Sequence, residues 1–198
     1  YHTALRWSGA SSADPFEGVK GVRDPTKPWQ KRPAYSDTDL EALLSVADAR
    51  ERVIVLLGAH AGLRASEIAG LKASDLDLRS RQMVVVGKGG SKRTVKLSAT
   101  LASSLQGFVP KHRKATLLGV GASRLRQMMD DLMTRAGLER SEASASGVHS
   151  LRHSSGTRLY RETRDLMLVR DHLGHSSVST SERYAKSDER LEKVVGEW

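Results

Sequence analysis

The sequence His149-Ser-Leu-Arg152-His153 opens a segment that continues through Leu173-Gly174-His175 and ends with Thr180-Ser-Glu-Arg-Tyr184. This segment brings imidazoles, a guanidinium and a tyrosine together in a chain whose aromatic content is only 5%. From His149 onward the apolar residues recur at helical spacing. We therefore interpret the segment as helical and as part of a site that handles phosphate, with Tyr184 as its nucleophile.

The composition favours a polyanionic partner. The chain has 198 residues, enough for one domain with a core, and carries 32 basic against 23 acidic residues, with a net charge of +9 and a pI near 10. Lysine and arginine that neutralise phosphates release counterions, which strengthens binding to nucleic acid. A basic surface that only keeps the protein in solution is the alternative. No apolar stretch approaches the roughly 18 residues of a membrane helix, and the absence of cysteine excludes disulfides and thiolate metal sites.

The pattern divides the chain into two parts. Residues 1–33 hold four of the five prolines, between glycines and serines, and are predicted to be a linker or the tail of a preceding domain. Residues 34–198 are predicted to form the organised domain. Its first signal is the helix N-cap Ser36-Asp-Thr-Asp39. The run Val53-Ile-Val-Leu-Leu57 fits a buried helix or a strand, and its alanine-containing flanks favour the helix. Further helices are predicted at about 64–71, 99–109, 123–136 and 188–195.

A small antiparallel sheet is predicted after residue 71. Apolar residues alternate with polar ones through Leu76 and Leu78, and the apolar run Met83-Val-Val-Val86 follows. The glycine-rich turn Gly87-Lys88-Gly89-Gly90 then leads into Arg93-Thr-Val-Lys-Leu97. Period-two patterning around such a turn is typical of a hairpin, and Lys88 lies at its tip.

Phosphodiester transfer suggests roles for these side chains. The transition state carries extra charge on the nonbridging oxygens, which the planar, permanently charged fork of Arg152 suits. A second arginine is needed for the other oxygen, and Arg64 is the candidate because Glu67, three residues on, can orient it. Lys88 could protonate the leaving oxygen. Tyr184, with an ordinary pKa near 10, needs help with its proton, which His149 could give.

The same residues carry a family resemblance. Ala61-Gly-Leu-Arg64-Ala-Ser-Glu67 resembles the first arginine box of the tyrosine recombinase (phage integrase) family, and Gly87-Lys88-Gly89 its lysine hairpin. His149-Ser-Leu-Arg152-His153 matches its second box, and Leu173-Gly174-His175 its histidine motif. Tyr184 follows His175 by nine residues, as the nucleophile of the family does. Each motif alone is weak, but the ordered set is specific.

The resemblance implies a mainly α fold with a small three-stranded antiparallel sheet, the catalytic domain of a site-specific DNA recombinase or integrase. Such an enzyme cleaves and rejoins strands through a 3′-phosphotyrosine and needs no metal or other cofactor. The expected partners are double-stranded DNA, three further copies in a tetramer on DNA, and a directionality factor, with a monomer as the alternative state in the absence of DNA. The expected location is the cytoplasm, at the nucleoid, of a bacterial, archaeal or phage-infected cell.

Carried over residue by residue, the resemblance assigns Arg64 and Arg152 to the scissile phosphate, and His175 to a nonbridging oxygen. Lys88 would protonate the 5′ leaving oxygen, Tyr184 would attack, and His149 would assist its proton transfer. Two further residues, Glu67 and His153, are expected to support these groups. Lysines and arginines expected to contact DNA are Lys92, Arg93, Lys111, Arg113 and Lys114.

Three other interpretations have to be weighed. His149, His153, His172 and His175 could form a metal cluster, but no cysteine or glutamate motif accompanies them and Arg152 would repel a cation. His172 alone fits a surface or helix-packing residue. A catalytically idle DNA-binding module of the same fold is a second interpretation, and a type IB topoisomerase is a third. The retention of all six catalytic side chains disfavours the idle module, and the compact hairpin and both histidines favour the recombinase.

Overall fold

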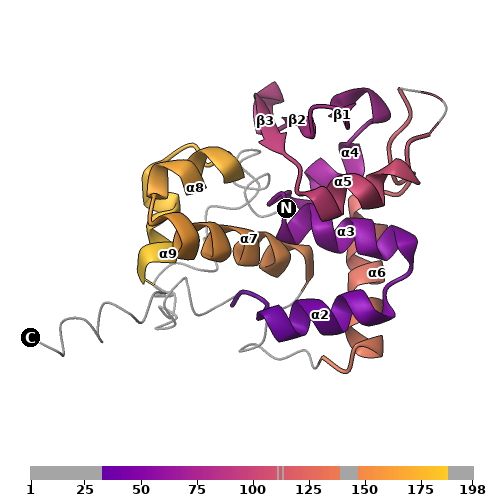
Figure 1. The fold of residues 1–198 in the computed structure, drawn as a ribbon, viewed down its shortest axis with the longest axis horizontal. Helices are drawn as coiled ribbons and strands as arrows, with labels where there is room; N and C mark the ends of the chain where they lie inside the picture. Colours follow the sequence, from indigo (N-terminus) through magenta and orange to yellow (C-terminus); the bar gives the residue numbers. More distant parts are fainter. Residues whose placement is uncertain (1–32, 111, 113, 139–146, 187–198) are drawn as a thin grey trace, which may run out of the picture.

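The computed structural model describes residues 33–110, 112, 114–138 and 147–186, and all of their side chains except those of Lys88, Arg183 and Lys186. Figure 1 shows a group of packed helices with a small sheet at one edge, as predicted. The helices are α2 (Asp37–Val46), α3 (Ala49–Ala59), α4 (Ala65–Gly70), α5 (Ala99–Gln106), α6 (Ala122–Arg135), α7 (Gly147–Thr163), α8 (Leu166–Leu173) and α9 (Glu182–Lys186). The strands are β1 (Leu76–Asp77), β2 (Gln82–Val86) and β3 (Lys92–Lys96), and the 3₁₀ turns are η1 (Ala73–Asp75), η2 (Lys88–Gly90) and η3 (Val178–Thr180). Of the predicted linker only Pro33 is described, and the predicted helix at 188–195 lies outside the described residues.

The first helices begin with side-chain caps that the sequence signals. Ser36 accepts a hydrogen bond from the Asp39 amide at 3.1 Å, and the Asp39 carboxylate accepts one from the Ser36 amide at 2.9 Å. Asp48 and Glu51 form the same reciprocal pair at the start of α3. Each box satisfies two amides that a helix N-terminus otherwise leaves without a partner. The predicted start at Ser36 is confirmed.

Helix α3 is the centre of the core. The run 53–57 is helical and essentially without solvent exposure, which is expected of a helix that is apolar on all sides. It packs against α7 and α5, and also against α2, α4 and α6. A Cβ placed on Gly58 would lie 2.6 Å from the Cβ of Leu151. Glycine therefore allows α7 to cross α3 closely, and this crossing fixes the position of the motif that begins at His149.

The sheet is antiparallel in the order β1-β2-β3, so the predicted three-stranded sheet is confirmed. Val85 lies opposite Arg93, and Val86 lies opposite Lys92. Alternation along β3 places Arg93 on the same face as the buried Val95. The hairpin turns through η2, where Gly89 and Gly90 adopt φ values of 74° and 79°. These left-handed conformations explain the glycine pair.

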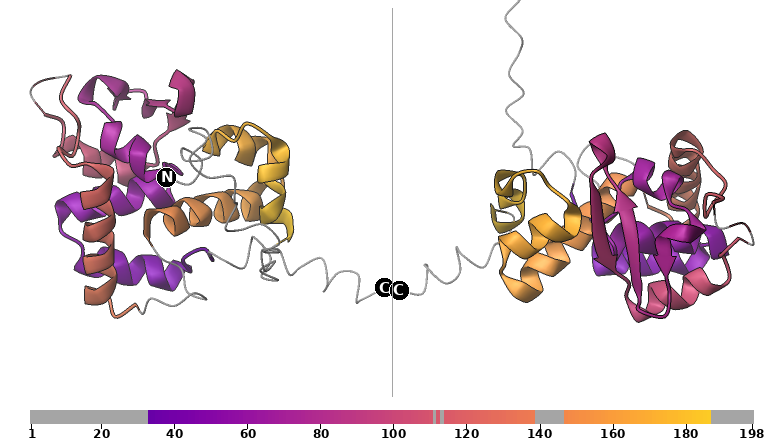
Figure 2. Two further views of the ribbon diagram at one scale, coloured as in Figure 1. Left: turned by 180° about the vertical axis from the view of Figure 1, so that it is seen from behind. Right: turned by 90° about the horizontal axis from the view of Figure 1, so that it is seen from above.

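Helices α8 and α9 form a separate layer at one end of α7. In both views of Figure 2 they lie to one side of α7, whereas the sheet and α2 to α6 lie to the other. A small second core of Val169, Leu173 and Tyr184, with Leu159 and Tyr160 against it, holds this layer together. Helix α8 ends at Gly174, whose φ of 65° forms the left-handed cap. The chain then turns back toward α7 and carries His175 with it.

Candidate active site

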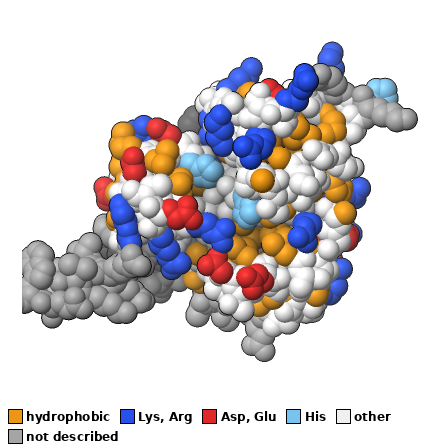
Figure 3. Space-filling model, in the orientation of Figure 1, with side chains coloured by type: hydrophobic (Ala, Val, Ile, Leu, Met, Phe, Trp, Pro, Cys, Tyr) orange, Lys and Arg blue, Asp and Glu red, His pale blue; other side chains and the backbone are white. Residues whose placement is uncertain are grey.

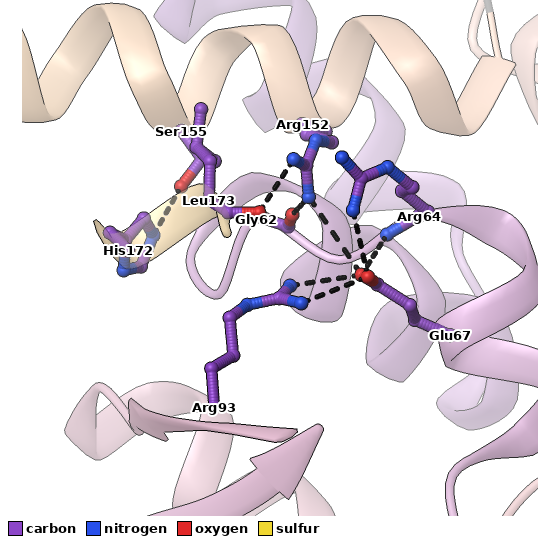
Figure 4. A network of polar contacts seen from close by, with 8 residues as sticks. All are labelled: Gly62, Arg64, Glu67, Arg93, Arg152, Ser155, His172 and Leu173. Carbon is purple, nitrogen blue, oxygen red and sulfur yellow. Dashed lines mark hydrogen bonds and ion pairs between the residues drawn. The ribbon is translucent and has the colours of Figure 1, made fainter. Parts of the chain in front are cut away.

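A buried carboxylate, Glu67, joins three arginines from three different parts of the chain (Figure 4). Arg64 at the N-terminus of α4 donates through its backbone amide and one Nη, each at 2.9 Å. Arg93 of β3 donates bidentately, with both Nη to oxygen distances at 2.9 Å. The Nη1 atom of Arg152, in α7, lies 3.7 Å from Oε2 of Glu67. Residues separated by more than 80 positions thus share one anion.

The charge of this network is unbalanced. Three guanidinium groups and one carboxylate leave two net positive charges in a half-enclosed place. Burial alone would raise the pKa of the Glu67 carboxyl, but the hydrogen bonds from Arg93 and the Arg64 backbone outweigh it and hold that pKa below its usual value. Glu67 is therefore ionised at neutral pH. The remaining positive charge favours an anionic ligand.

Arg152 is held almost entirely by the protein itself. Its side chain is about 4% exposed, and its two Nη atoms donate to the backbone carbonyls of Gly62 and of Leu173, the latter at 2.6 Å. Burial, followed by the charge of Arg64, lowers the pKa of Arg152 to about 10. The guanidinium stays charged at neutral pH and is fixed in one orientation, a condition for preorganised stabilisation of charge.

A cleft of about 1020 Å³ opens beside this network. It lies between the start of α4, the β2–β3 hairpin and the residues after α8. Its lining residues are Arg64, Ser66, Glu67, Val86, Gly87, Gly89, Ser91, Lys92, Arg93, Gly174, His175 and Ser176. On the face shown in Figure 3, Lys and Arg side chains gather over the sheet and continue down the middle of the molecule next to histidines. The cleft has the size and charge to receive a phosphate group together with part of the molecule that carries it.

His175 lines the cleft, and Tyr184 lies behind it with its ring stacked on the imidazole. His175 Nδ1 and Ser181 Oγ share a hydrogen bond of 2.8 Å. The imidazole is stacked on the Tyr184 ring with centroids 6.4 Å apart and an interplanar angle of 5°. Tyr184 is only 3% exposed, and its ring also lies 5.1 Å from that of His153. The phenol is thus near the network but enclosed.

Gly156 makes the tight seat for Tyr184. A Cβ at position 156 would lie 2.5 Å from Cζ and 2.8 Å from Oη of Tyr184, closer than real contacts allow. Only glycine at this point of α7 leaves room for the ring. The spacing of Tyr184 from His175 and the glycine in α7 therefore work together to dock α9.

The structure brings together most of the residues singled out from the sequence. Arg64, Glu67 and His175 line one cleft, and Arg152 is bonded to its edge. The backbone of Lys88 belongs to the hairpin whose Gly87 and Gly89 line that cleft, while its side chain is outside the description.

The other predicted residues are placed less centrally. His149 is exposed in the first turn of α7 and is not among the lining residues, whereas His153 is buried against Tyr184. Lys92 is exposed and lines the cleft, and Lys114 is exposed elsewhere. Lys111 and Arg113 lie outside the described residues.

Sequence reasoning missed three polar contacts. The contact of Arg93 with Glu67 is the first of them, while its predicted contact with DNA stays a prediction. The alternation along β3 signals this, because Arg93 shares its face with buried residues. Ser181 as the partner of His175, and the pair Ser155–His172 between α7 and α8, had no signal in the spacing alone.

Two structural features are absent from the described part of the chain. No group of three or more His, Cys, Asp or Glu side chains there is arranged to hold a metal ion. No helix in that part is long and apolar enough to cross a membrane.

Comparison with known proteins identifies the family. Residues 35–190 match the model of the phage integrase family. Tyrosine recombinase XerC of Mycobacterium leprae is 31% identical over 205 residues, covering 90% of this chain and 66% of that protein. The chain belongs to the phage integrase family, as the motifs predict.

Solved structures agree with this assignment. The crystal structure of XerA recombinase has a TM-score of 0.71 at 24% identity, covering 88% of this chain and 66% of that one. The XerH site-specific recombinase bound to palindromic difH substrate, in a post-cleavage complex, has a TM-score of 0.69 at 26% identity. The overlap covers 90% of this chain and 56% of that chain. The chain thus spans just over half to two thirds of the length of these relatives.

Proposed function

We propose that residues 34–198 are the catalytic domain of a site-specific DNA recombinase that cleaves and rejoins strands through a 3′-phosphotyrosine. The observation that carries the proposal is the buried Glu67 network, which leaves two positive charges at a cleft lined by His175, whose ring is stacked on that of Tyr184. Relatives named tyrosine recombinases, and a recombinase described in a post-cleavage complex with its DNA substrate, support it.

The phosphate is bound first in the proposed mechanism. Arg64, whose side chain is 43% exposed at the cleft, donates to one nonbridging oxygen, and Arg152 donates to the other. His175 lines the cleft and donates to a nonbridging oxygen as well, while its Nδ1 is held by Ser181. Because the protein holds these donors before DNA arrives, they stabilise the charge of the transition state more than that of the ground state.

Strand cleavage then exchanges one phosphoester for another. The phenolic oxygen of Tyr184 forms a bond to phosphorus as the bond from phosphorus to the 5′ oxygen breaks. The tyrosine proton passes to His149 or to water, and Lys88 protonates the leaving 5′ oxygen. Attack by a 5′ hydroxyl on the phosphotyrosine reverses these steps and rejoins a strand, so no energy source is consumed. The chemistry needs no metal ion or other cofactor.

Tyr184 has to leave its seat to attack. Tyr184 does not line the cleft, and its hydroxyl lies against Gly156 of α7, so the hydroxyl cannot meet a phosphate in the cleft without a shift of α9. Helix α9 has five residues and is held by the small second core, so a modest loss of contacts is enough to release it. We propose that bound DNA draws the tyrosine out.

The wider biological setting is part of the proposal. We infer that the protein acts as a tetramer on double-stranded DNA in the cytoplasm, at the nucleoid, with a directionality factor to choose between integration and excision. Residues 1–33 would link this domain to a preceding one that helps to close around DNA.

The proposal is tested by first sequencing the DNA junctions that the protein forms in cells. A nicked duplex with the site so found should then trap a covalent protein–DNA adduct in the presence of chelator. Loss of the adduct on chelation would contradict the metal-free mechanism, and absence of any adduct would favour the idle binding module. Ladders of relaxed topoisomers from a plasmid that lacks paired sites would favour the topoisomerase.

A further inference from the structure

Ser155 and His172 form a polar contact that the proposed mechanism does not use. Ser155 Oγ and His172 Nε2 are 3.0 Å apart, and Ser155 is 5% exposed. Ser155 lies in α7 one turn beyond Arg152, and His172 is the last residue but one of α8. Figure 4 shows the pair beside Leu173, which accepts a hydrogen bond from Arg152. The contact therefore joins the two helices at the place where Arg152 is held.

Both backbone carbonyls that accept hydrogen bonds from Arg152 lie next to the Ser155–His172 contact. The Leu173 carbonyl belongs to the residue directly after His172. The Gly62 carbonyl comes from the loop between α3 and α4, and a Cβ on Gly62 would lie 2.5 Å from Leu173 Cδ2. The same Cβ would lie 3.3 Å from His172 Nε2 and 3.3 Å from Ser155 Oγ. A displaced His172 would therefore move both oxygens that aim the guanidinium.

The charge state of His172 suits this arrangement. Burial, followed by the charges of Arg93 and Arg152, lowers the pKa of His172 to about 4. At neutral pH the imidazole is uncharged and adds no repulsion beside the guanidiniums. A hydrogen-bonded pair in this place fixes an orientation, whereas an apolar pair of the same volume would only fill space.

We propose that Ser155 and His172 are positioning residues for the phosphate clamp, the pair Arg64 and Arg152 that the proposed mechanism places on the scissile phosphate. Their hydrogen bond fixes the end of α8, and with it the two carbonyls that orient Arg152. Neither side chain lines the cleft, and the proposed mechanism gives neither of them a contact with the substrate. The catalytic consequence rests on the function proposed above, but the hold on Arg152 is a property of the chain without DNA. The two parts are therefore tested separately.

The first test needs no DNA and follows the Arg152 guanidinium by ¹⁵N NMR, with the Arg152→Lys variant to assign its signals. In the wild type, a guanidinium held by two carbonyls rotates slowly and gives separate Nη signals. His172→Leu is expected to merge them, and His172→Gln to keep them separate because its amide can still reach Ser155. Unchanged Arg152 signals in His172→Leu would overturn the proposal.

Two more variants keep this test decisive. Ser155→Ala removes the same hydrogen bond with a smaller change in volume, and it decides the question if His172→Leu does not fold. Ser154→Ala is the matched control, because the neighbouring Ser154 hydroxyl is also buried but donates to the carbonyls of Tyr35 and Ser150. It is expected to lower stability and leave the Arg152 signals unchanged. Merged signals in this control would show that any loss of stability in α7 has the same effect, and would also overturn the proposal.

The second test measures strand cleavage on the nicked duplex, with either a normal phosphate or a neutral methylphosphonate at the scissile position. His172→Leu is expected to slow cleavage of the phosphate on the order of 10-fold to 100-fold, the effect of a misplaced catalytic group, while DNA affinity is unchanged. The loss should shrink on the methylphosphonate, which presents less charge to Arg152, and His172→Gln should restore the rate. Equal losses on both substrates would refute the role in catalysis. Failure of the wild type to cleave would instead contradict the proposed function and leave the NMR result to decide the hold on Arg152.

Discussion

Replacement of Glu67 by glutamine should destabilise the protein strongly, although the two side chains have nearly the same shape. The change raises the net charge of the network from two to three positive charges. The side chains of Glu67 and Arg152 are each 4% exposed and that of Arg93 is 14% exposed, so solvent screens little of this charge. Removing one partner of a buried ion pair costs about 3–5 kcal/mol. Arg64 is 43% exposed and contributes little to that sum.

The assay is equilibrium unfolding in urea, followed by circular dichroism at neutral pH. Glu51→Gln is the matched control, because Glu51 is also buried but, among the described residues, pairs with a single arginine, Arg135, which is 48% exposed. This control should lose about 1 kcal/mol. An equal loss in the two variants, or a Glu67→Gln protein as stable as the wild type, would refute the claim that one carboxylate balances three arginines.

Three further predictions concern the packing of Tyr184 on Gly156, the titration of His172 and the role of Arg64 in the phosphate clamp. Gly156→Ala should lower the free energy of unfolding by about 1–3 kcal/mol through overpacking and should raise the reactivity of Tyr184 to nitration. Gly107→Ala is the control and should be nearly neutral, because a Cβ at position 107 meets no atom within 4 Å. Unchanged nitration of Tyr184 in Gly156→Ala would contradict the close packing of its ring on Gly156. Burial lowers the pKa of His172 to about 4, whereas the unfolded chain binds this proton near pH 6.5. The contribution of His172 to the free energy of unfolding should therefore be complete above about pH 6.5. It should decrease by up to about 3 kcal/mol as the pH drops toward 4, because the unfolded chain binds the proton first. His172→Leu should flatten this part of the pH curve, and an unchanged curve would refute the assignment. Arg64→Ala should slow cleavage by on the order of 10²-fold or more, as expected for a lost charge-stabilising donor, with near-normal rates counting against the clamp.

The sequence predicts the elements better than the contacts between them. The helix start at Ser36 is predictable because an N-cap is a signal within a few residues of sequence. The hairpin around Gly89 is predictable for the same reason, because its left-handed glycines are adjacent in sequence. The run at 53–57 is ambiguous in its period because it is buried on every side, and its flanks, which continue the helix from Ala49 to Ala59, decide in favour of a helix.

Tertiary contacts explain what the sequence left open. The reach of Arg93 to Glu67 depends on how the sheet packs on α4, which no local pattern encodes. The seat of Tyr184 likewise depends on Gly156, which gives no signal by itself in a helix. Ordered motifs could place Arg64, Arg152, His175 and Tyr184 in one site, because their chemistry requires a common phosphate. They could not show that the tyrosine is enclosed.

The most direct test of the account is to digest the protein–DNA adduct with protease and nuclease and to locate the nucleotide by mass spectrometry. We expect a nucleotide esterified to Tyr184, formed in the presence of chelator. The Tyr184→Phe variant should form no such adduct but should still bind DNA. A nucleotide on any other residue, or an adduct that persists in Tyr184→Phe, would contradict it.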